Sequence, residues 1–178
     1  MKIVPSGRLH YRLMNLSDKD LLLEVDKDPV VMKYINNGIA ASDQDIEDIT
    51  LPRLAKYINP SKGWGIWEVR ENQSKSYLGW ILVRPMHYFS ARPDFDNWEL
   101  GWRFKQACWG KGYASESAKH IMLALSKAHN VTTFSAIADA DNQASIKVMK
   151  KIGMTFEKSA LYKDPLINMQ VEYYRIDL

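Results

Sequence analysis

The chain has 178 residues, of which 46% are hydrophobic and 25% charged, so its length and composition fit one globular domain and exclude a disordered chain. The 24 Lys and Arg residues against 21 Asp and Glu leave a formal net charge of +3, which is too small to indicate nucleic-acid binding. The single cysteine, the short apolar runs, the scattered histidines and the lack of a signal peptide predict a cytoplasmic protein without a disulfide, a membrane span or a metal.

A strand and a helix are predicted at the start of the chain. Residues 8–14 alternate between apolar and polar side chains, as a half-buried strand does. Ser17 with Asp18 can cap a helix over residues 19–28. Pro29 is expected to end this helix, because proline has no N–H for the next helical hydrogen bond.

A second helix and a hairpin follow in the predicted order. Ser42 or Asp43 can cap a helix over residues 44–58, in which Pro52 is an interior interruption or a break into two pieces. Two aromatic and β-branched runs around Asn-Gln-Ser-Lys are typical of a hairpin, and they cover residues 63–71 and 76–84.

The second half of the chain alternates more regularly between strands and helices. Apolar residues recur at spacings of three and four from Tyr113 to His129, which predicts an amphipathic helix. Asp141 or Asn142 can cap a further helix that Gly153 ends. The other predicted segments are a long connection at 85–97 and strands at 98–104, 131–138, 154–160 and 168–178. No linker divides this pattern, so we expect one α/β domain over residues 1–178.

A glycine-rich segment, Ala-Cys-Trp-Gly-Lys-Gly-Tyr at 107–113, lies between a predicted strand and a predicted helix, where phosphate-binding loops occur. A Walker loop needs glycine at position 105 and Ser or Thr at 112, and a dinucleotide-binding loop needs glycine at 115. The chain does not have these residues. A loop that donates successive backbone N–H groups to a pyrophosphate fits Gly110 and Gly112, which could otherwise be plain turn glycines.

Three segments resemble, in this order, the linked signatures of the GNAT superfamily of acetyl-CoA-dependent N-acetyltransferases, and most closely its RimJ/RimL-like branch. They are Glu-Leu-Gly-Trp-Arg-Phe at 99–104, Trp-Gly-Lys-Gly-Tyr-Ala-Ser-Glu-Ser-Ala at 109–118 and the segment that starts Asp-Asn-Gln-Ala-Ser at 141–154. The resemblance implies a mixed, mostly antiparallel sheet of six to seven strands flanked by helices, with a splayed central strand pair. One position departs from the pattern, because Ala107 replaces the usual Gln or Arg before the loop.

The resemblance also implies acetyl-CoA as co-substrate, with no metal. Its pyrophosphate would lie on the backbone N–H groups of the loop, and Lys111 would add a cation. The pantetheine arm would extend along the preceding strand, Asn142 would hydrogen-bond it, and Ser145 would lie near the thioester sulfur. The implied cofactor-binding positions are Trp102, Arg103, Phe104, Cys108, Trp109, Gly110, Lys111, Gly112, Tyr113, Ala114, Asn142 and Ser145.

Acetyl transfer from a thioester requires an uncharged amine, a donor for the developing oxyanion and a proton for the departing thiolate. By its match to the family's strand motif, Glu99 is our candidate for the base, directly or through water. Ser145 is our candidate for protonating or stabilising the sulfur. Simpler interpretations exist, since Glu99 can pair with a Lys or Arg across the sheet, Ser145 can have only a backbone partner, and Asn142 can be only a helix cap.

The acceptor is expected to be a primary amine, on a protein N-terminus or a small molecule, and neither nucleic acid nor membrane is expected as a partner. By resemblance it would lie between the N-terminal helices and the late strands. Residues expected to line that site are Tyr34, Trp64, Asp94, Asp96 and Tyr162. The alternative function is a catalytically silent acyl-CoA-binding sensor or interaction module, and pairing of late strands across chains makes a homodimer a further expectation.

Overall fold

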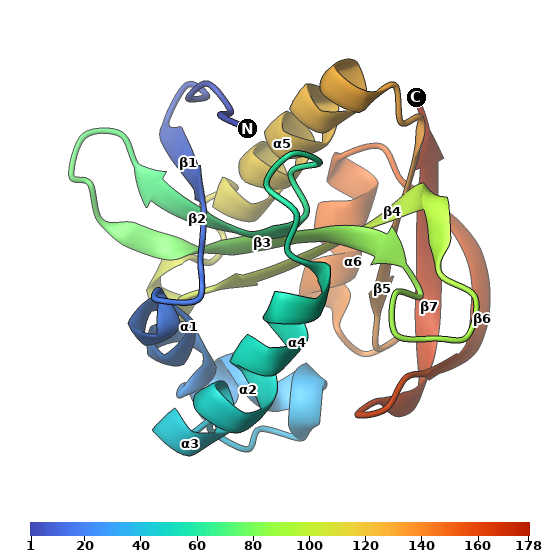
Figure 1. The fold of residues 1–178 in the computed structure, drawn as a ribbon, viewed down its shortest axis with the longest axis horizontal. Helices are drawn as coiled ribbons and strands as arrows, with labels where there is room; N and C mark the ends of the chain where they lie inside the picture. Colours follow the sequence, from blue (N-terminus) through green and yellow to red (C-terminus); the bar gives the residue numbers. More distant parts are fainter.

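Seven strands form one mixed sheet in the order β1-β2-β3-β4-β5-β7-β6 (Figure 1). The computed structural model describes residues 1–178. All neighbouring strands are antiparallel except β4 and β5, which run parallel. The strands are β1 (Leu9–Leu13), β2 (Gly65–Glu71), β3 (Tyr77–Met86), β4 (Asp94–Phe104), β5 (Thr133–Ala138), β6 (Thr155–Lys163) and β7 (Asn168–Asp177). The helical segments are α1 (Lys19–Asp26), α2 (Pro29–Asn36), α3 (Asp43–Asp45), the π-helical η1 (Ile46–Thr50), α4 (Leu51–Tyr57), the 3-10 turn η2 (Gln106–Cys108), α5 (Tyr113–His129) and α6 (Gln143–Lys151).

Helix α2 is missing from the sequence-based prediction, which placed only a helix end at Pro29. Helix α1 does end before Pro29, but Pro29 is also the first residue of α2. Proline suits that position because its missing N–H needs no partner there and its φ is already helical. The Asp28 carboxylate accepts a hydrogen bond from the Val30 N–H at 2.9 Å and caps the new helix.

The second predicted helix is present as three consecutive segments, α3, η1 and α4. Ser42 and Asp45 form a capping box, in which the Asp45 N–H donates to Ser42 Oγ at 3.1 Å and the Ser42 N–H donates to the Asp45 carboxylate at 2.8 Å. Pro52 lies in the first turn of α4, where a missing N–H is tolerated, and the wider π-helical turn precedes it. The predicted interruption is therefore confirmed as a change of helix type.

Helices cover both faces of the sheet (Figure 1). Helices α5 and α6 pack on one face, in a core of 24 buried residues. Segments α1, η1 and α4 pack on the other face, in a second core of 9 buried residues. Along β4, the side chains of Trp98, Leu100 and Phe104 belong to the first core. Because side chains alternate along a strand, Glu99 and Arg103 point to the opposite face, where Arg103 pairs with Asp26 of α1.

The parallel pairing of β4 with β5 covers only a short stretch, which joins Asn97 to Thr133, Trp98 to Phe134 and Glu99 to Ser135. Beyond Glu99, β4 stays paired with β3 as far as Phe104, and β5 stays paired with β7 as far as Ala138. The two strands therefore separate after Glu99, and the edge of residues 100–104 that faces β5 has no strand partner. This split confirms the splayed central pair expected from the resemblance.

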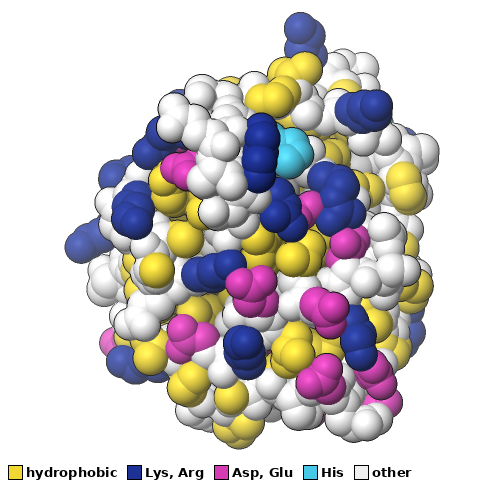
Figure 2. Space-filling view, turned by 90° about the vertical axis from the view of Figure 1, so that its left-hand side faces the viewer, with side chains coloured by type: hydrophobic (Ala, Val, Ile, Leu, Met, Phe, Trp, Pro, Cys, Tyr) yellow, Lys and Arg dark blue, Asp and Glu magenta, His cyan; other side chains and the backbone are white.

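The surface mixes charges of both signs. Figure 2 shows the face that includes the β2–β3 hairpin, where Lys and Arg side chains gather in the upper half and Asp and Glu side chains lie mainly in the middle and lower half. Apolar side chains lie among these charges. None of the helices combines the length and the apolar character that crossing a membrane requires.

Candidate active site

The glycine loop between η2 and α5 presents a row of unpaired backbone N–H groups. Gly110 and Gly112 have φ angles of 74° and 79°, in the left-handed region that glycine adopts readily. The N–H groups from Gly110 to Ser115 have no hydrogen-bond acceptor within the chain, and Gly112 is the N-cap of α5. Because α5 has 17 residues, the positive end of a long helix dipole adds to these donors. The loop therefore offers a site for an anion such as a pyrophosphate.

Two N–H groups in the predicted pyrophosphate site already have partners. The Cys108 N–H donates to Lys105 O at 2.9 Å, and the Trp109 N–H donates to Gln106 O at 3.0 Å. These bonds close the 3-10 turn η2, which satisfies its own backbone. Of the N–H groups from Cys108 to Ala114 on which the pyrophosphate is expected to lie, these two therefore have acceptors in the chain, and the row without acceptors runs from Gly110 to Ser115.

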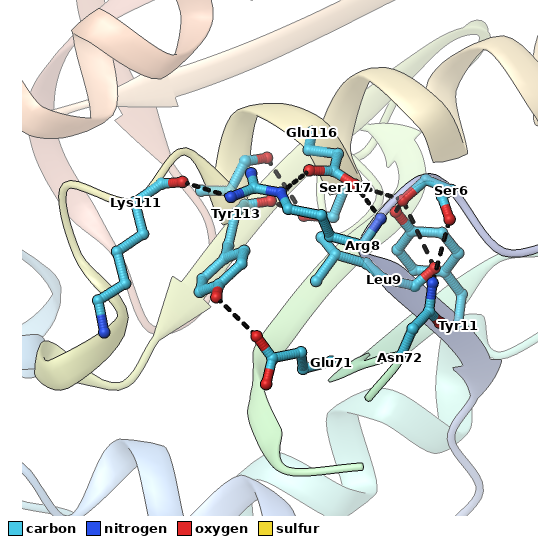
Figure 3. A network of polar contacts seen from close by, with 11 residues as sticks. Ser6, Arg8, Leu9, Tyr11, Glu71, Asn72, Lys111, Tyr113, Glu116 and Ser117 are labelled. Carbon is cyan, nitrogen blue, oxygen red and sulfur yellow. Dashed lines mark hydrogen bonds and ion pairs between the residues drawn. The ribbon is translucent and has the colours of Figure 1, made fainter. Parts of the chain in front are cut away.

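Arg8 lies just before β1 and forms hydrogen bonds to the loop and to the first turn of α5 (Figure 3). This residue was not identified from the sequence. Its guanidinium donates to Glu116 Oε2 at 2.7 Å and to Lys111 O at 3.1 Å, and it lies 4.7 Å from the centre of the Tyr113 ring. The Tyr113 hydroxyl donates in turn to Glu71 Oε1 at 3.0 Å, at the end of β2. The start of α5 is thus fixed to two strands.

The first turn of α6 lies beside the split between β4 and β5. The Ser145 N–H donates to Asn142 Oδ1 at 3.2 Å, which confirms the predicted cap. Trp102 Nε1 on β4 donates to Ser145 Oγ at 3.3 Å and so links the strand to the helix. Because the Ser145 oxygen accepts this bond, the hydroxyl hydrogen is free to be donated elsewhere.

Glu99 forms a buried ion pair with Arg84, the residue directly opposite it on β3. Arg84 Nε donates to Glu99 Oε2 at 2.7 Å and Arg84 Nη2 donates to Oε1 at 3.1 Å, while Nη2 also lies 3.4 Å from the Tyr162 hydroxyl. Burial alone would lower the pKa of Arg84, but the facing Glu99 carboxylate more than reverses this and the pKa is raised. The pairing of Glu99 across the sheet is confirmed, and its catalytic role stays a prediction.

Glu99 and Ser145 approach the split from opposite faces of the sheet. Ser145 contacts Trp102, whose ring packs against the core under α5 and α6. Glu99 and Arg84 lie on the other face, where Arg84 lies 5.6 Å from the centre of the Tyr57 ring on α4. A reacting group held between the separated strands would therefore have the carboxylate on one side and the hydroxyl on the other.

Two cavities separate residues that were expected to share one acceptor site. A cavity of about 490 Å³ is lined by Tyr34 of α2 and by Asp139 and Asp141, which follow β5. Trp64 and Asp96 line a different cavity of about 590 Å³ at the carboxyl end of α5. The expectation that Tyr34 and Trp64 share one site is therefore wrong, because they lie near opposite ends of the β4–β5 pair.

The comparisons with known proteins point to one family. A family model described as "Acetyltransferase (GNAT) domain" matches residues 8–155. An uncharacterized N-acetyltransferase of Bacillus subtilis, YnaD, is 30% identical over 156 residues, which are 86% of this chain and 83% of that protein. The crystal structure of a GNAT-family acetyltransferase from Bacillus anthracis superposes with a TM-score of 0.76 at 26% identity, covering 99% of this chain and 98% of that chain.

A further solved structure is that of RimL, an alpha-N-protein acetyltransferase, in complex with coenzyme A. It superposes with a TM-score of 0.74 at 16% identity, covering 100% of this chain and 98% of that chain, and this likeness shows the fold. The chain belongs to the GNAT family of acetyltransferases. Within that family it is an N-acetyltransferase of the RimJ/RimL type, whose members use acetyl-CoA.

Proposed function

We propose that the chain transfers the acetyl group of acetyl-CoA to a primary amine, on a protein N-terminus or a small molecule, by direct attack within a ternary complex. The observation that carries this proposal is the free N–H row from Gly110 to Ser115 beside the open edge of β4. The row suits a pyrophosphate and the open edge suits an extended arm. The RimL structure holds coenzyme A, which supports acetyl-CoA as the ligand of this chain. RimL is an alpha-N-protein acetyltransferase, which supports a protein N-terminus as the acceptor.

Acetyl-CoA supplies an activated acyl group and a thiolate that leaves readily. The N–H row holds its pyrophosphate, and Lys111 contributes a cation at the loop. The open edge from Trp102 to Phe104, including Arg103, hydrogen-bonds the pantetheine arm as an added strand would. The side-chain N–H groups of Asn142 donate to the same arm, while its Oδ1 keeps the cap on α6.

Ser145 acts on the leaving sulfur. Trp102 holds the Ser145 oxygen, so the hydroxyl hydrogen is directed away from that bond and is donated to the sulfur as the carbon–sulfur bond breaks. A backbone N–H on the open edge of β4 near Trp102 donates to the carbonyl oxygen, where negative charge develops.

Glu99 accepts the proton that the acceptor's ammonium must lose before it can attack. Arg84 donates to both carboxylate oxygens from the β3 side, and the remaining lone pairs are free to accept a proton directly or through water. The cavity lined by Lys33, Asp139 and Asp141 has two carboxylates and one cation, a balance that favours the approach of a cationic amine.

A thermal melt with acetyl-CoA, ATP and NAD tests the ligand. Acetyl-CoA at one hundred times its Kd is expected to stabilise the protein by ~2.7 kcal/mol, which raises the midpoint by roughly 5–10 °C for a chain of this length. ATP and NAD should raise it much less. A larger rise with ATP or NAD would contradict the proposed ligand.

Release of the coenzyme A thiol separates the enzyme from the silent acyl-CoA sensor. Both would be stabilised by acetyl-CoA, but only the enzyme should release free thiol when peptides with free N-termini or small primary amines are added. A protein that binds acetyl-CoA tightly and releases no thiol with any amine tried would support the sensor instead.

Replacing Gly112 with alanine is expected to weaken acetyl-CoA binding about tenfold or more. Gly112 has a left-handed φ of 79°, and alanine in that conformation costs ~1–2 kcal/mol. The backbone would rotate to relieve this strain, so the N–H groups of the loop would no longer point toward one anion. Isothermal titration measures the Kd. Gly7→Ala is the matched control, because an added methyl there meets no atom within 4 Å, and it should leave the Kd unchanged.

A further inference from the structure

Ser135 on β5 lies beside Glu99 at the last paired position before β4 and β5 separate. Residues paired across neighbouring strands point to the same face of a sheet. One position earlier, the rings of Trp98 and Phe134 meet with their centres 6.2 Å apart, which confirms this register. The Ser135 side chain therefore shares the face of Glu99, with Arg84 flanking Glu99 on the other side.

The hydroxyl of Ser135 is buried without a partner. The residue is 1% exposed, and its Oγ has no hydrogen-bond partner in the chain. The other fully buried serine, Ser117, is satisfied, because its Oγ donates to Tyr113 O at 2.7 Å. A buried hydroxyl requires a hydrogen-bond partner and the chain supplies none, so Ser135 is placed to hydrogen-bond a small molecule at the site.

The spacing of the strands suits a water molecule between Ser135 and Glu99. Neighbouring strands lie about 4.8 Å apart, so two paired side chains of this length can hold one water with a hydrogen bond on each side. Arg84 occupies the β3 side of the carboxylate, which leaves the β5 side, where Ser135 lies, for a proton to arrive.

We propose that Ser135 is a positioning residue whose hydroxyl holds the water through which the acceptor's proton reaches Glu99. The inference rests on the proposed function. The ammonium N–H bond breaks as its proton passes to the water, and the water passes another of its protons to the Glu99 carboxylate. The freed nitrogen lone pair forms the new bond to the acetyl carbon, the carbon–sulfur bond breaks, and the thiolate takes a proton from Ser145. The nitrogen then loses its second proton to solvent as the amide forms, and the Ser145 oxygen regains a proton from solvent.

Ser135→Ala tests this role because it should lower activity while changing stability little. No group of the chain loses a hydrogen bond in this variant, so the melting midpoint is expected to change by less than about 4 °C. Losing the water's anchor is expected to lower kcat by about tenfold or more at neutral pH, with KM for acetyl-CoA unchanged. Ser135→Thr, which keeps the hydroxyl, should restore most of kcat.

Matched measurements separate this role from a structural one. Ser117→Ala removes the hydroxyl of the other fully buried serine, which bonds only to its own helix, so it should leave kcat unchanged. An active wild type with an equally active Ser135→Ala variant would overturn the inference, as would a Ser135→Ala variant that melts lower and loses activity only through instability. A wild type that releases no thiol with any amine would instead overturn the proposed function.

Discussion

Replacing Glu99 with glutamine is expected to lower kcat/KM by about 10²- to 10⁴-fold, because a general base usually accounts for a factor of that size. The loss should shrink as the pH rises. An α-amino acceptor has a pKa of about 7.7–8.0, so at higher pH it loses its proton to solvent and no longer needs the carboxylate. The measurement is the pH profile of kcat/KM for both proteins with the best amine from the thiol-release screen.

Glu68→Gln is the matched control for this substitution. Glu68 is also a buried carboxylate, 2% exposed, and it is ion-paired with Arg12 of β1 and Arg70 of β2. Both variants remove one charge from a buried pair, so both should lose stability, but only Glu99→Gln should lose activity well below its melting midpoint. Equal kcat/KM in the two variants at all pH values would contradict Glu99 as the base.

Local features of the chain were predictable from the sequence because they depend on neighbours along the chain. The stripe of apolar residues in α5 gives its bounds, Tyr113 and His129, and Asn142 caps α6 as its side chain suggests. The connection at 85–97 was predicted too long. Strands β3 and β4 both extend into it, and a register shift between Pro85 and Met86 hides the alternation there.

The partners of the site residues were not predictable, because strand register and distant contacts determine them. Arg8 reaches Glu116, which is 108 positions away along the chain. Arg84 and Ser135 flank Glu99 only because three strands pair in one particular register. Nothing near Arg84 or Ser135 in the sequence marks either residue, whereas the loop glycines were recognisable because a strand-to-helix turn requires their left-handed φ.

Replacing Arg84 with methionine is expected to lower the free energy of unfolding by about 3–5 kcal/mol, because it leaves the buried Glu99 carboxylate without its partner. Arg84 is 7% exposed and Glu99 is 5% exposed, so water reaches neither group freely. A loss of this size lowers the melting midpoint by roughly 6–20 °C. Denaturant unfolding with and without the substitution measures it, and a loss below about 1 kcal/mol would mean that water solvates the carboxylate after all.

The double variant Arg84→Met with Glu99→Leu distinguishes stability from chemistry. Replacing a whole buried ion pair by apolar residues of similar volume is often neutral or stabilising, so the double variant should recover most of the stability lost by Arg84→Met. It should still lack acetyltransferase activity, because the proton acceptor is gone. A stable but inactive double variant would mean that the chain keeps a costly charge pair at the split for its chemistry.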